Sequence, residues 1–324
     1  MPVQLYLTNG YQWGMMDTIT GSEVKNVFVV LNPVAGNSNG NQTQEQIETR
    51  FNELGWQFRV YETNASESVA EVVGEACKSG ANLIIAAGGD GTVAGVVNGL
   101  MHSGVLLGII PVGTGNGLAR ALSIPLDVSE AIDLISGPHH AQPIDALQVN
   151  DDYYLLNVSV GISSRSMKNT GHEQKQRFGM AAYARTILKE VIGVTPRRFD
   201  LEVDGHSLQV RATEILVANG SILQTPTDLF GSAESFADGE VEAHILTARS
   251  LRGYLRLGWQ LLSRPKGRKD DLRRLKVRER ISIDSVRKPQ PVQADGELIG
   301  QTPVEIRVVP RALRVIVPES DDQH

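Results

Sequence analysis

Residues 82–100 have the sequence NLIIAAGGDGTVAGVVNGL, an apolar run followed by a glycine-rich turn and a helical pattern. The run from Asn82 to Gly89 is continuously apolar, which is typical of a strand covered on both faces of a parallel sheet. Beyond the turn, apolar residues recur at helical spacing, at Val93, Val96, Val97 and Leu100. The stretch therefore predicts a buried parallel strand that enters a helix through the turn GGDGT, residues 88–92.

The same alternation of strand and helix surrounds this stretch. Apolar runs at Lys25–Pro33 and Leu106–Gly113 predict two more buried strands, and QFRVYET, residues 57–63, predicts another. Helical patterns separate these runs. This order is typical of a doubly wound, mostly parallel sheet in an α/β domain.

The pattern changes near residue 146. Short strand-like runs follow, with hairpin signals such as Asp204-Gly205, and they indicate an antiparallel β-sandwich. We expect an N-terminal arm over residues 1–23, an α/β domain over 24–145 and the sandwich over 146–303. We also consider that the C-terminal segment, about 304–324, returns to the α/β domain.

Composition narrows the class of protein. Of the 324 residues, 41% are hydrophobic and 21% charged, as in ordinary globular proteins, and the net charge of −6 argues against a general nucleic-acid binder. The single cysteine, Cys77, excludes an internal disulfide and favours a reducing compartment. No apolar run approaches the ~18 residues that span a bilayer. We therefore expect a cytoplasmic protein that touches a membrane only at its surface.

Three glycine-rich turns follow predicted strands: NPVAGN (32–37), GGDGT (88–92) and GTGNG (113–117). In open α/β sheets, ligands bind outside the carboxyl ends of the strands, so these turns are expected to converge. Glycine lets the backbone approach a polyanion, and N–H groups at a helix start bind phosphate oxygens. Alone, GGDGT is explained about equally well as a strand-to-helix turn without a ligand, and GTGNG is a weak signal that a capped helix start also explains. NPVAGN alone is better explained as an ordinary turn at the end of a strand.

Together with Asp295-Gly296-Glu297, the three turns resemble the catalytic domain shared by diacylglycerol kinases, sphingosine kinases and related bacterial lipid kinases. The resemblance covers residues 25 to about 317. It implies an N-terminal domain of the NAD kinase/diacylglycerol kinase-like fold with a β-sandwich second domain. It also implies transfer of the γ-phosphate of ATP to a lipid hydroxyl such as that of diacylglycerol.

The resemblance also implies site residues. Nucleotide contacts fall on Asn32, Pro33, Val34, Ala35, Gly36, Thr63, Gly89, Asp90, Gly91, Thr92, Val93, Ala94, Gly95 and Thr114. Glu297 is implied as the base that takes the proton of the lipid hydroxyl. ATP and Mg²⁺ are the implied cofactors, and a structural Mg²⁺ would be held by Ser235, Asp238 and Glu240, with Asp145 nearby.

The chemistry of the residues agrees with these implied roles. Phosphoryl transfer needs the γ-phosphate held and its charge neutralised, and a carboxylate can accept the proton of the hydroxyl. Asp90 and Asp295 are candidates for the neutralising role, and Asp90 is the second catalytic candidate beside Glu297.

Two positions depart from the family pattern. The family usually has a glutamate where this chain has Gly95 and an aspartate where it has Gly117, so two carboxylates near the phosphates are missing. The departures predict altered nucleotide binding or reduced activity, and they leave open a nucleotide- or lipid-binding regulator without catalysis. A soluble-substrate kinase of the NAD kinase type is the other alternative, although the Gly-Thr-Gly-Asn run and Asp295-Gly296-Glu297 favour the lipid branch.

Partners are suggested by a basic stretch. Residues 249–280 contain twelve Lys or Arg against three acids and include an amphipathic helical pattern. Such a segment favours contact with an anionic membrane surface, although a solvated helix face and charged loop would have the same composition. Nucleic acid is disfavoured because no aromatic residues lie among the charges of residues 265–280. We expect a lipid substrate as partner and leave a homodimer open.

Overall fold

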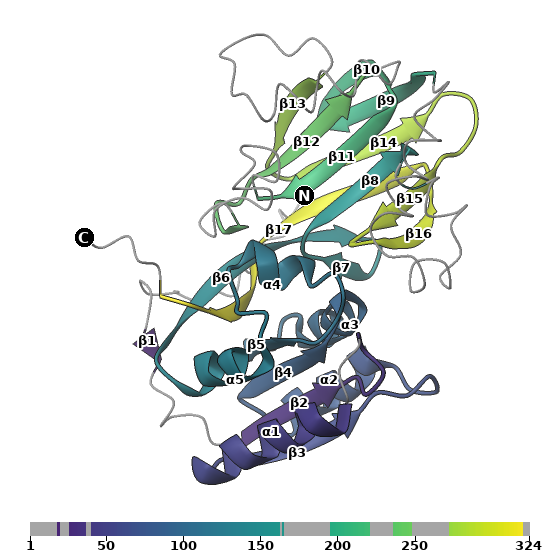
Figure 1. Ribbon diagram of the computed structural model, residues 1–324. Helices are drawn as coiled ribbons and strands as arrows, with labels where there is room; N and C mark the ends of the chain where they lie inside the picture. Colours follow the sequence, from purple (N-terminus) through teal and green to yellow (C-terminus); the bar gives the residue numbers. More distant parts are fainter. Residues whose placement is uncertain are drawn as a thin grey trace, which may run out of the picture.

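The computed structural model describes residues 18–19, 26–36, 40–162, 164, 195–220, 236–247 and 272–319 of the chain. Ser235, the amphipathic helical pattern of residues 251–262 and most of the predicted arm lie outside these ranges. In Figure 1 the α/β part lies below and the sandwich above.

The α/β part contains four parallel strands in the order β5-β4-β2-β3: β2 (Asn26–Leu31), β3 (Gln57–Glu62), β4 (Leu83–Gly88) and β5 (Leu106–Pro111). Residues of β4 and β5 are buried throughout, because helices cover both faces of the sheet. The doubly wound sheet expected from the apolar runs is confirmed.

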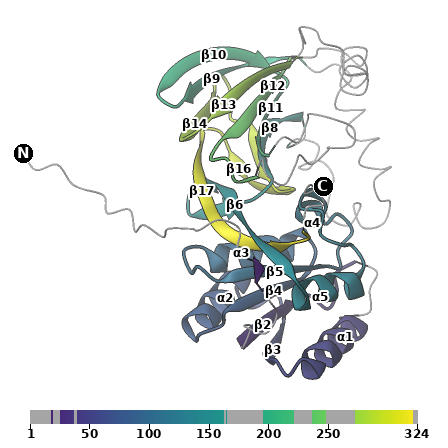
Figure 2. The same ribbon diagram turned by 90° about the vertical axis from the view of Figure 1, so that its left-hand side faces the viewer.

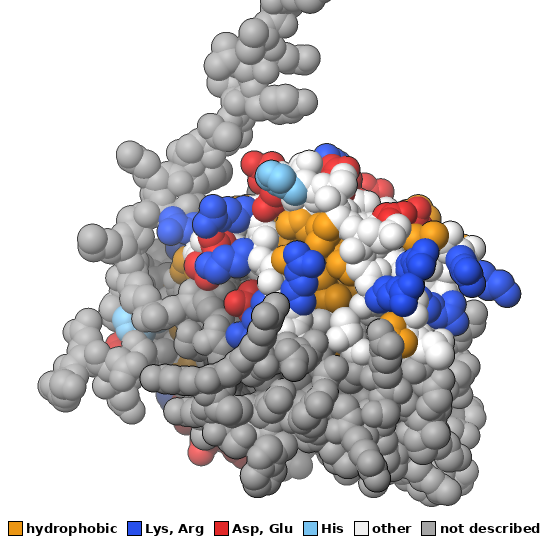
Figure 3. Space-filling view, turned by 90° about the horizontal axis from the view of Figure 1, so that it is seen from above, with side chains coloured by type: hydrophobic (Ala, Val, Ile, Leu, Met, Phe, Trp, Pro, Cys, Tyr) orange, Lys and Arg blue, Asp and Glu red, His pale blue; other side chains and the backbone are white. Residues whose placement is uncertain are grey.

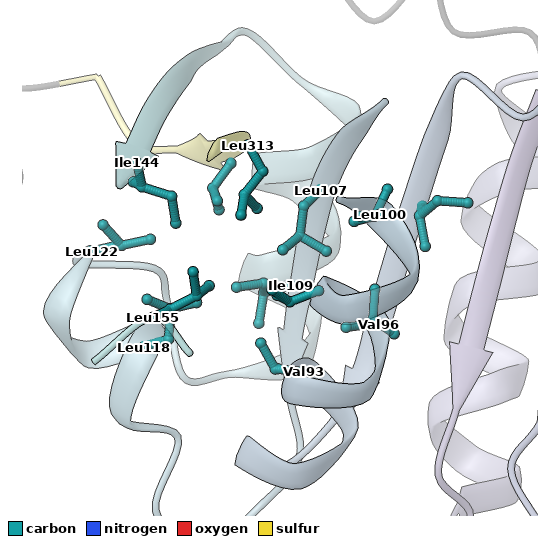
Figure 4. Close-up of a cluster of buried hydrophobic side chains, with 14 of the residues drawn as sticks. Val93, Val96, Leu100, Leu107, Ile109, Leu118, Leu122, Ile144, Leu155 and Leu313 are labelled. Carbon is teal, nitrogen blue, oxygen red and sulfur yellow. The ribbon is translucent and has the colours of Figure 1, made fainter. Parts of the chain in front are cut away.

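Five helices accompany these strands: α1 (Gly40–Glu53), α2 (Val69–Lys78), α3 (Asp90–Leu100), α4 (Gly117–Ala121) and α5 (Val128–Ser136). One buried cluster joins α2 and α3 to the sheet, and another joins α1 and α5 to it. Figure 4 shows the first cluster, in which side chains of α3, β5 and α4 gather with Leu155 and Leu313. This packing fixes the start of α3 at the carboxyl end of β4.

The sandwich has two antiparallel layers. One is a sheet of order β13-β12-β11-β8-β15-β16, and the other contains β10, β9, β14 and part of β17. Asp204 and Gly205, both at positive φ, make the predicted hairpin between β9 and β10. The inner faces form a second buried core, and the expected antiparallel second domain is confirmed. The strand bounds are β8 (Asn157–Gly161), β9 (Arg197–Val203), β10 (His206–Ala212), β11 (Glu214–Asn219), β12 (Val241–Leu246), β13 (Leu272–Val277), β14 (Arg280–Ser285), β15 (Pro291–Ala294) and β16 (Glu297–Gln301).

One long strand connects the two parts. β17 (Val304–Val317) pairs with β14 in the sandwich and lies parallel to β5 at Arg314 and Val315. Between these ends it runs antiparallel to β6 (His139–Val149), and Figures 1 and 2 show both strands passing from one part to the other. Two short strands pair with β6: β1 (Thr18–Ile19) and β7 (Asp152–Tyr154). Within the described residues a single eleven-stranded sheet therefore extends through the α/β part into the sandwich.

Candidate active site

The three glycine-rich turns meet at the carboxyl ends of the parallel strands. Gly36 has φ +63°, and a Cβ atom there would overlap the carbonyl oxygen of Val112. A Cβ at Gly113 would overlap the Cα of Gly89. Glycine is needed at these positions because backbone lies against backbone, so the expected convergence of the turns is present in the structure.

Side chains hold the first and third turns in shape. The Asn32 Nδ2 atom donates to Thr92 Oγ1 at 3.2 Å, which joins the first turn to the second. Asn116, at φ +53°, accepts from the Gly113 N–H at 3.0 Å and donates to the Gly113 carbonyl at 2.8 Å. The backbone of this region is therefore fixed by hydrogen bonds within the site.

The predicted nucleotide contacts lie in different environments. Val34 is 83% exposed and Thr114 is exposed, whereas the side chain of Val93 is buried in the core. Thr63 follows β3 and donates its N–H to the Leu31 carbonyl at 2.8 Å. Gly89 is the N-cap of α3, and no side chain caps this helix. The N–H groups of the first turn of α3 are thus available to an anion.

Asp90 links the second and third turns. Its Oδ1 atom accepts from the Gly117 N–H at 2.6 Å, at the start of α4. A Cβ at Gly115 would lie 2.5 Å from Asp90 Oδ2, and a Cβ at Gly117 would lie 2.8 Å from Leu156 Cδ1. Gly117 therefore binds Asp90 through its backbone N–H, and the place of its missing side chain is directed at Leu156.

Glu297, the first residue of β16, reaches the second turn from the sandwich. Its Oε1 atom lies 3.3 Å from the position that a Cβ of Gly91 would occupy. The Glu297 side chain is exposed, and Gly91 is in the first turn of α3. The two predicted catalytic residues, Asp90 and Glu297, are thus carried to the same end of α3.

Asp295 anchors the turn that precedes Glu297. Its carboxylate accepts the N–H groups of Leu155, Leu156 and Asn157 at 2.8, 3.0 and 2.8 Å. Burial raises the pKa of Asp295 to about 6, with a further contribution from the charge of Asp90, although the three N–H donors act in the opposite direction. Asp295 therefore anchors this turn in the structure, and its neutralising role toward phosphate stays a prediction.

Sequence reasoning missed the β7 segment, which lies between α3 and Asp295. Tyr153 exchanges backbone hydrogen bonds with the side chain of Asn98 on α3. Burial raises the pKa of Tyr154 to about 12, and the carboxylates of Asp152, Asp295 and Glu297 add to this shift. The only signal in the sequence is Asn98 itself, a polar residue within an apolar helical stripe.

Two of the three residues predicted to hold a structural metal, Asp238 and Glu240, are among the described residues. Both oxygens of Glu240 are engaged in ion pairs with Lys276 and Arg278, and Asp238 Oδ1 accepts the Glu240 N–H at 2.9 Å. In the described part of the chain, no group of three His, Cys, Asp or Glu side chains is placed to hold a metal ion. Asp238 and Glu240 are thus engaged by neighbouring groups, and Ser235 lies outside the described residues, so the structural Mg²⁺ site stays a prediction.

Asp145 instead fastens the junction between the two parts. Its two oxygens accept the N–H groups of Gly239 and Arg311, each at 2.7 Å. The Asp145 residue is fully buried, and burial raises its pKa against the effect of these two donors.

Gly95 also has a structural explanation. A Cβ there would lie 3.0 Å from the Cβ of Val69, at the start of α2. The side-chain position of residue 95 is directed at a helix–helix contact, so glycine here allows α2 and α3 to approach.

No helix among the described residues has the length and apolar character needed to cross a membrane.

Both parts of the chain match known family models. Residues 26–149 match the diacylglycerol kinase catalytic domain, and residues 156–317 match the YegS C-terminal NAD kinase beta sandwich-like domain.

Similar proteins carry related names. The chain is 30% identical to the diacylglycerol kinase of Bacillus subtilis (strain 168), over 91% of this chain and 97% of that protein. It is also 30% identical to the "Probable lipid kinase YegS-like" of Alcanivorax borkumensis, over 88% of this chain and 95% of that protein. A crystal structure of a diacylglycerol kinase from Bacillus anthracis str. Sterne has the same fold, with a TM-score of 0.70 at 22% identity over 91% of this chain and 97% of that one.

Proposed function

Since the chain belongs to the family of diacylglycerol kinases and YegS-like lipid kinases, we propose that it transfers the γ-phosphate of ATP to the hydroxyl group of a lipid such as diacylglycerol. The observation that carries the proposal is the approach of Glu297, from the sandwich, to Gly91 in the glycine turn of the α/β part. A proton acceptor and a phosphate-binding turn from different halves of the chain are the two parts that this reaction needs.

The turns at residues 32–36, 88–92 and 113–117 are suited to the nucleotide phosphates. Gly36 lies against the backbone of Val112 and Gly113 against that of Gly89, with no side chain at these contacts, so N–H groups can approach phosphate oxygens closely. The uncapped start of α3 adds the positive end of a helix dipole. ATP enters with Mg²⁺ as part of the substrate, and this ion neutralises phosphate charge during transfer.

Glu297 is placed to act on the acceptor. An exposed carboxylate beside the phosphate turn can accept the hydroxyl proton as the new O–P bond forms. Tyr154 keeps its proton at neutral pH, so its phenol adds no negative charge beside Glu297. Asp90, hydrogen-bonded to Gly117, keeps the second and third turns together around the transferred group.

The decisive experiment follows the label from ATP. The purified protein is incubated with labelled ATP, Mg²⁺ and lipids in mixed micelles, with NAD alongside. We expect label in a phosphorylated lipid, and Glu297→Gln should lower the rate by at least ~100-fold while nucleotide binding persists. Glu45→Gln, an exposed acid on α1, is the matched control.

Other outcomes would favour the alternatives. Label only in NADP would identify a kinase with a soluble substrate. Nucleotide binding with no product from any acceptor would favour a regulator without catalysis.

We also propose a peripheral membrane contact at the far end of the sandwich. Figure 3 looks onto this end, where apolar side chains lie among Lys and Arg side chains. A groove of about 580 Å³ there is lined by residues of β10 and β13, including Leu208, Leu275, Arg273 and Lys276. The strands that line it, β10 and β13, lie away from α3 in Figure 1, so a contact here would tether the protein rather than deliver the acceptor.

Ion pairs limit the charge that this surface offers, because Glu240 already binds Lys276 and Arg278. We expect cosedimentation with vesicles containing anionic lipid, weakened by salt and by Arg273→Glu. Equal binding to neutral vesicles would contradict an electrostatic contact.

A further inference from the structure

Asn98 lies on α3, two turns beyond Asp90, and its side chain binds the backbone of β7. Its Oδ1 atom accepts the Tyr153 N–H at 2.9 Å, and its Nδ2 atom donates to the Tyr153 carbonyl at 3.1 Å. The second Nδ2 hydrogen goes to the Ala94 carbonyl of the same helix at 2.9 Å. One amide side chain therefore satisfies both backbone groups of Tyr153, as a neighbouring strand would.

The hydrogen bonds continue from Tyr153 to the Asp295 turn. Leu155, Leu156 and Asn157 follow Tyr153 and donate their N–H groups to the Asp295 carboxylate. The Asp295 N–H donates back to the Asn157 carbonyl at 3.0 Å. The backbone from residue 153 to residue 157 is thus held at one end by α3 and at the other by Asp295.

The path closes on itself at the start of α3. Glu297 is two residues beyond Asp295, and its Oε1 atom stands beside Gly91. A closed circuit therefore runs from Gly91 along the helix to Asn98, across to Tyr153, through Asp295 and back to Glu297. Within this circuit α3 is rigid. The hydrogen bonds of Asn98 therefore determine where Tyr153, Asp295 and Glu297 lie relative to the helix.

Contacts around the circuit support the same segment. The Asn219 Nδ2 atom, fully buried on β11, donates to the Leu155 carbonyl at 2.9 Å, and the Asn219 N–H donates to the Leu156 carbonyl at 2.8 Å. The His102 Nε2 atom lies 3.1 Å from the Tyr153 hydroxyl. Of these side chains, Asn98 is the one that binds the backbone of this segment to α3, the helix that begins at the phosphate turn.

We infer that Asn98 is a positioning residue that sets the place of Glu297 over the phosphate turn, an inference that rests on the proposed function. Asn98 touches neither substrate in this scheme. Its effect passes through Tyr153 and Asp295 to the carboxylate that accepts the proton, so it should influence the chemical step more than nucleotide binding.

Kinetics of Asn98→Ala test this effect in the lipid kinase assay. We expect kcat to fall by about 10- to 100-fold, because misplacing a reacting group by about 1 Å is enough for such a loss. KM for ATP should change less than about threefold, since the phosphate turns are untouched. Asn98→Gln, which keeps the amide donor and acceptor on a longer side chain, should show a smaller loss and serves if the alanine variant does not fold. Asn52→Ala, on the exposed face of α1, is the control.

A double variant separates positioning from general damage. If Asn98 acts through Glu297, adding Asn98→Ala to Glu297→Gln should lower the residual kcat by less than about twofold. Fully multiplicative losses, or a raised KM for ATP with kcat unchanged, would overturn the inference.

Hydrogen exchange supplies a readout that needs no activity. In Asn98→Ala the amide hydrogens of Tyr153, Leu155, Leu156 and Asn157 should exchange about tenfold faster, with α1 unchanged. If the wild-type protein phosphorylates no lipid, the proposed function fails, and exchange at these amides still decides whether Asn98 holds the segment. Unchanged exchange there would refute the positioning role.

Discussion

Gly113 lies where the second and third glycine turns touch, and a Cβ there would overlap the Cα of Gly89. Backbone cannot move aside as the end of a flexible side chain can, so Gly113→Ala should separate the turns. We expect the free energy of unfolding to fall by about 1–3 kcal/mol and nucleotide affinity to fall with it. Urea denaturation and nucleotide titration measure the two effects.

Gly74→Ala is the matched control for this substitution. Gly74 is inside α2, and the nearest atom to its added Cβ is the Gly99 carbonyl oxygen at 3.9 Å. Alanine should therefore stabilise the protein by about 0.5–1 kcal/mol through helix propensity. If Gly113→Ala were as well tolerated, the turns would not be in the close contact described here.

Asp295 gives the site a specific dependence on pH. Its pKa is about 6 in the folded chain and near 3.8 in the unfolded chain, so between these values the folded state binds more protons. This carboxyl therefore makes the free energy of unfolding decrease as pH rises through that window, by about 3 kcal/mol at ~1.4 kcal/mol per pH unit. The stabilising contribution is present below pH 4 and lost above pH 6.

Asp295→Asn removes this titration. The variant should be less stable than wild type at every pH, because an amide cannot accept all three N–H groups. The difference should be greater near pH 4.5 than near pH 7.5, by about 2 kcal/mol. Urea unfolding at both pH values measures it, with Asp284→Asn on the exposed face of β14 as control. A difference that is constant with pH would contradict the raised pKa.

Among individual residues, the sequence predicted those of the motifs better than those that hold the motifs in place. The convergence of the glycine turns and the approach of Glu297 followed from turns placed after buried strands and from the family pattern. The roles of Asn98, Tyr153 and Tyr154 could not be predicted in this way, because a side chain that binds a distant backbone leaves no periodic signal in the sequence. The anchoring role of Asp295 likewise depends on three N–H groups about 140 positions away.

Among the elements, the contact between α2 and α3 decides what residue 95 can be. A glutamate at Gly95 would restore the usual carboxylate of the family, but its Cβ would press on Val69 at 3.0 Å. We expect Gly95→Glu to lower the free energy of unfolding by about 1–3 kcal/mol, despite the better helix propensity, and not to raise activity. Gly95→Ala isolates the Cβ contact from the charge. Higher activity in Gly95→Glu at unchanged stability would show that the missing carboxylate limits the enzyme.

Elements that are buried on both faces were the easiest to predict. β4 and β5 are continuous apolar runs because helices cover each side, and such a short run bounded by turn residues is typical of a strand of this kind. β17 was harder, since its alternation is the same whether it pairs with β14 or β5. It pairs with β14 near its start and with β5 near its end, and only the pairing itself reveals this.

For the whole molecule, β17 joins two hydrophobic cores in one strand. Ile306 is fully buried in the sandwich core, and Ile316 is 1% exposed in the core under α1 and α5. Because the strand is shared and Asp145 fastens the junction, the two parts should unfold together in one transition. Ile306→Ala and Ile316→Ala should then each lower the stability of the entire chain by about 2–5 kcal/mol.

Hydrogen exchange under increasing urea tests this coupling directly. Amide hydrogens of α1 and of β12 report on the α/β part and the sandwich, and we expect both to lose protection at the same urea concentration in wild type and in each variant. Val286→Ala, at a side chain that is 45% exposed, is the control and should leave the midpoint unchanged. If Ile306→Ala lowered the midpoint only for β12 and Ile316→Ala only for α1, the two parts would unfold independently. The contact between Glu297 and Gly91 would then open without loss of either core.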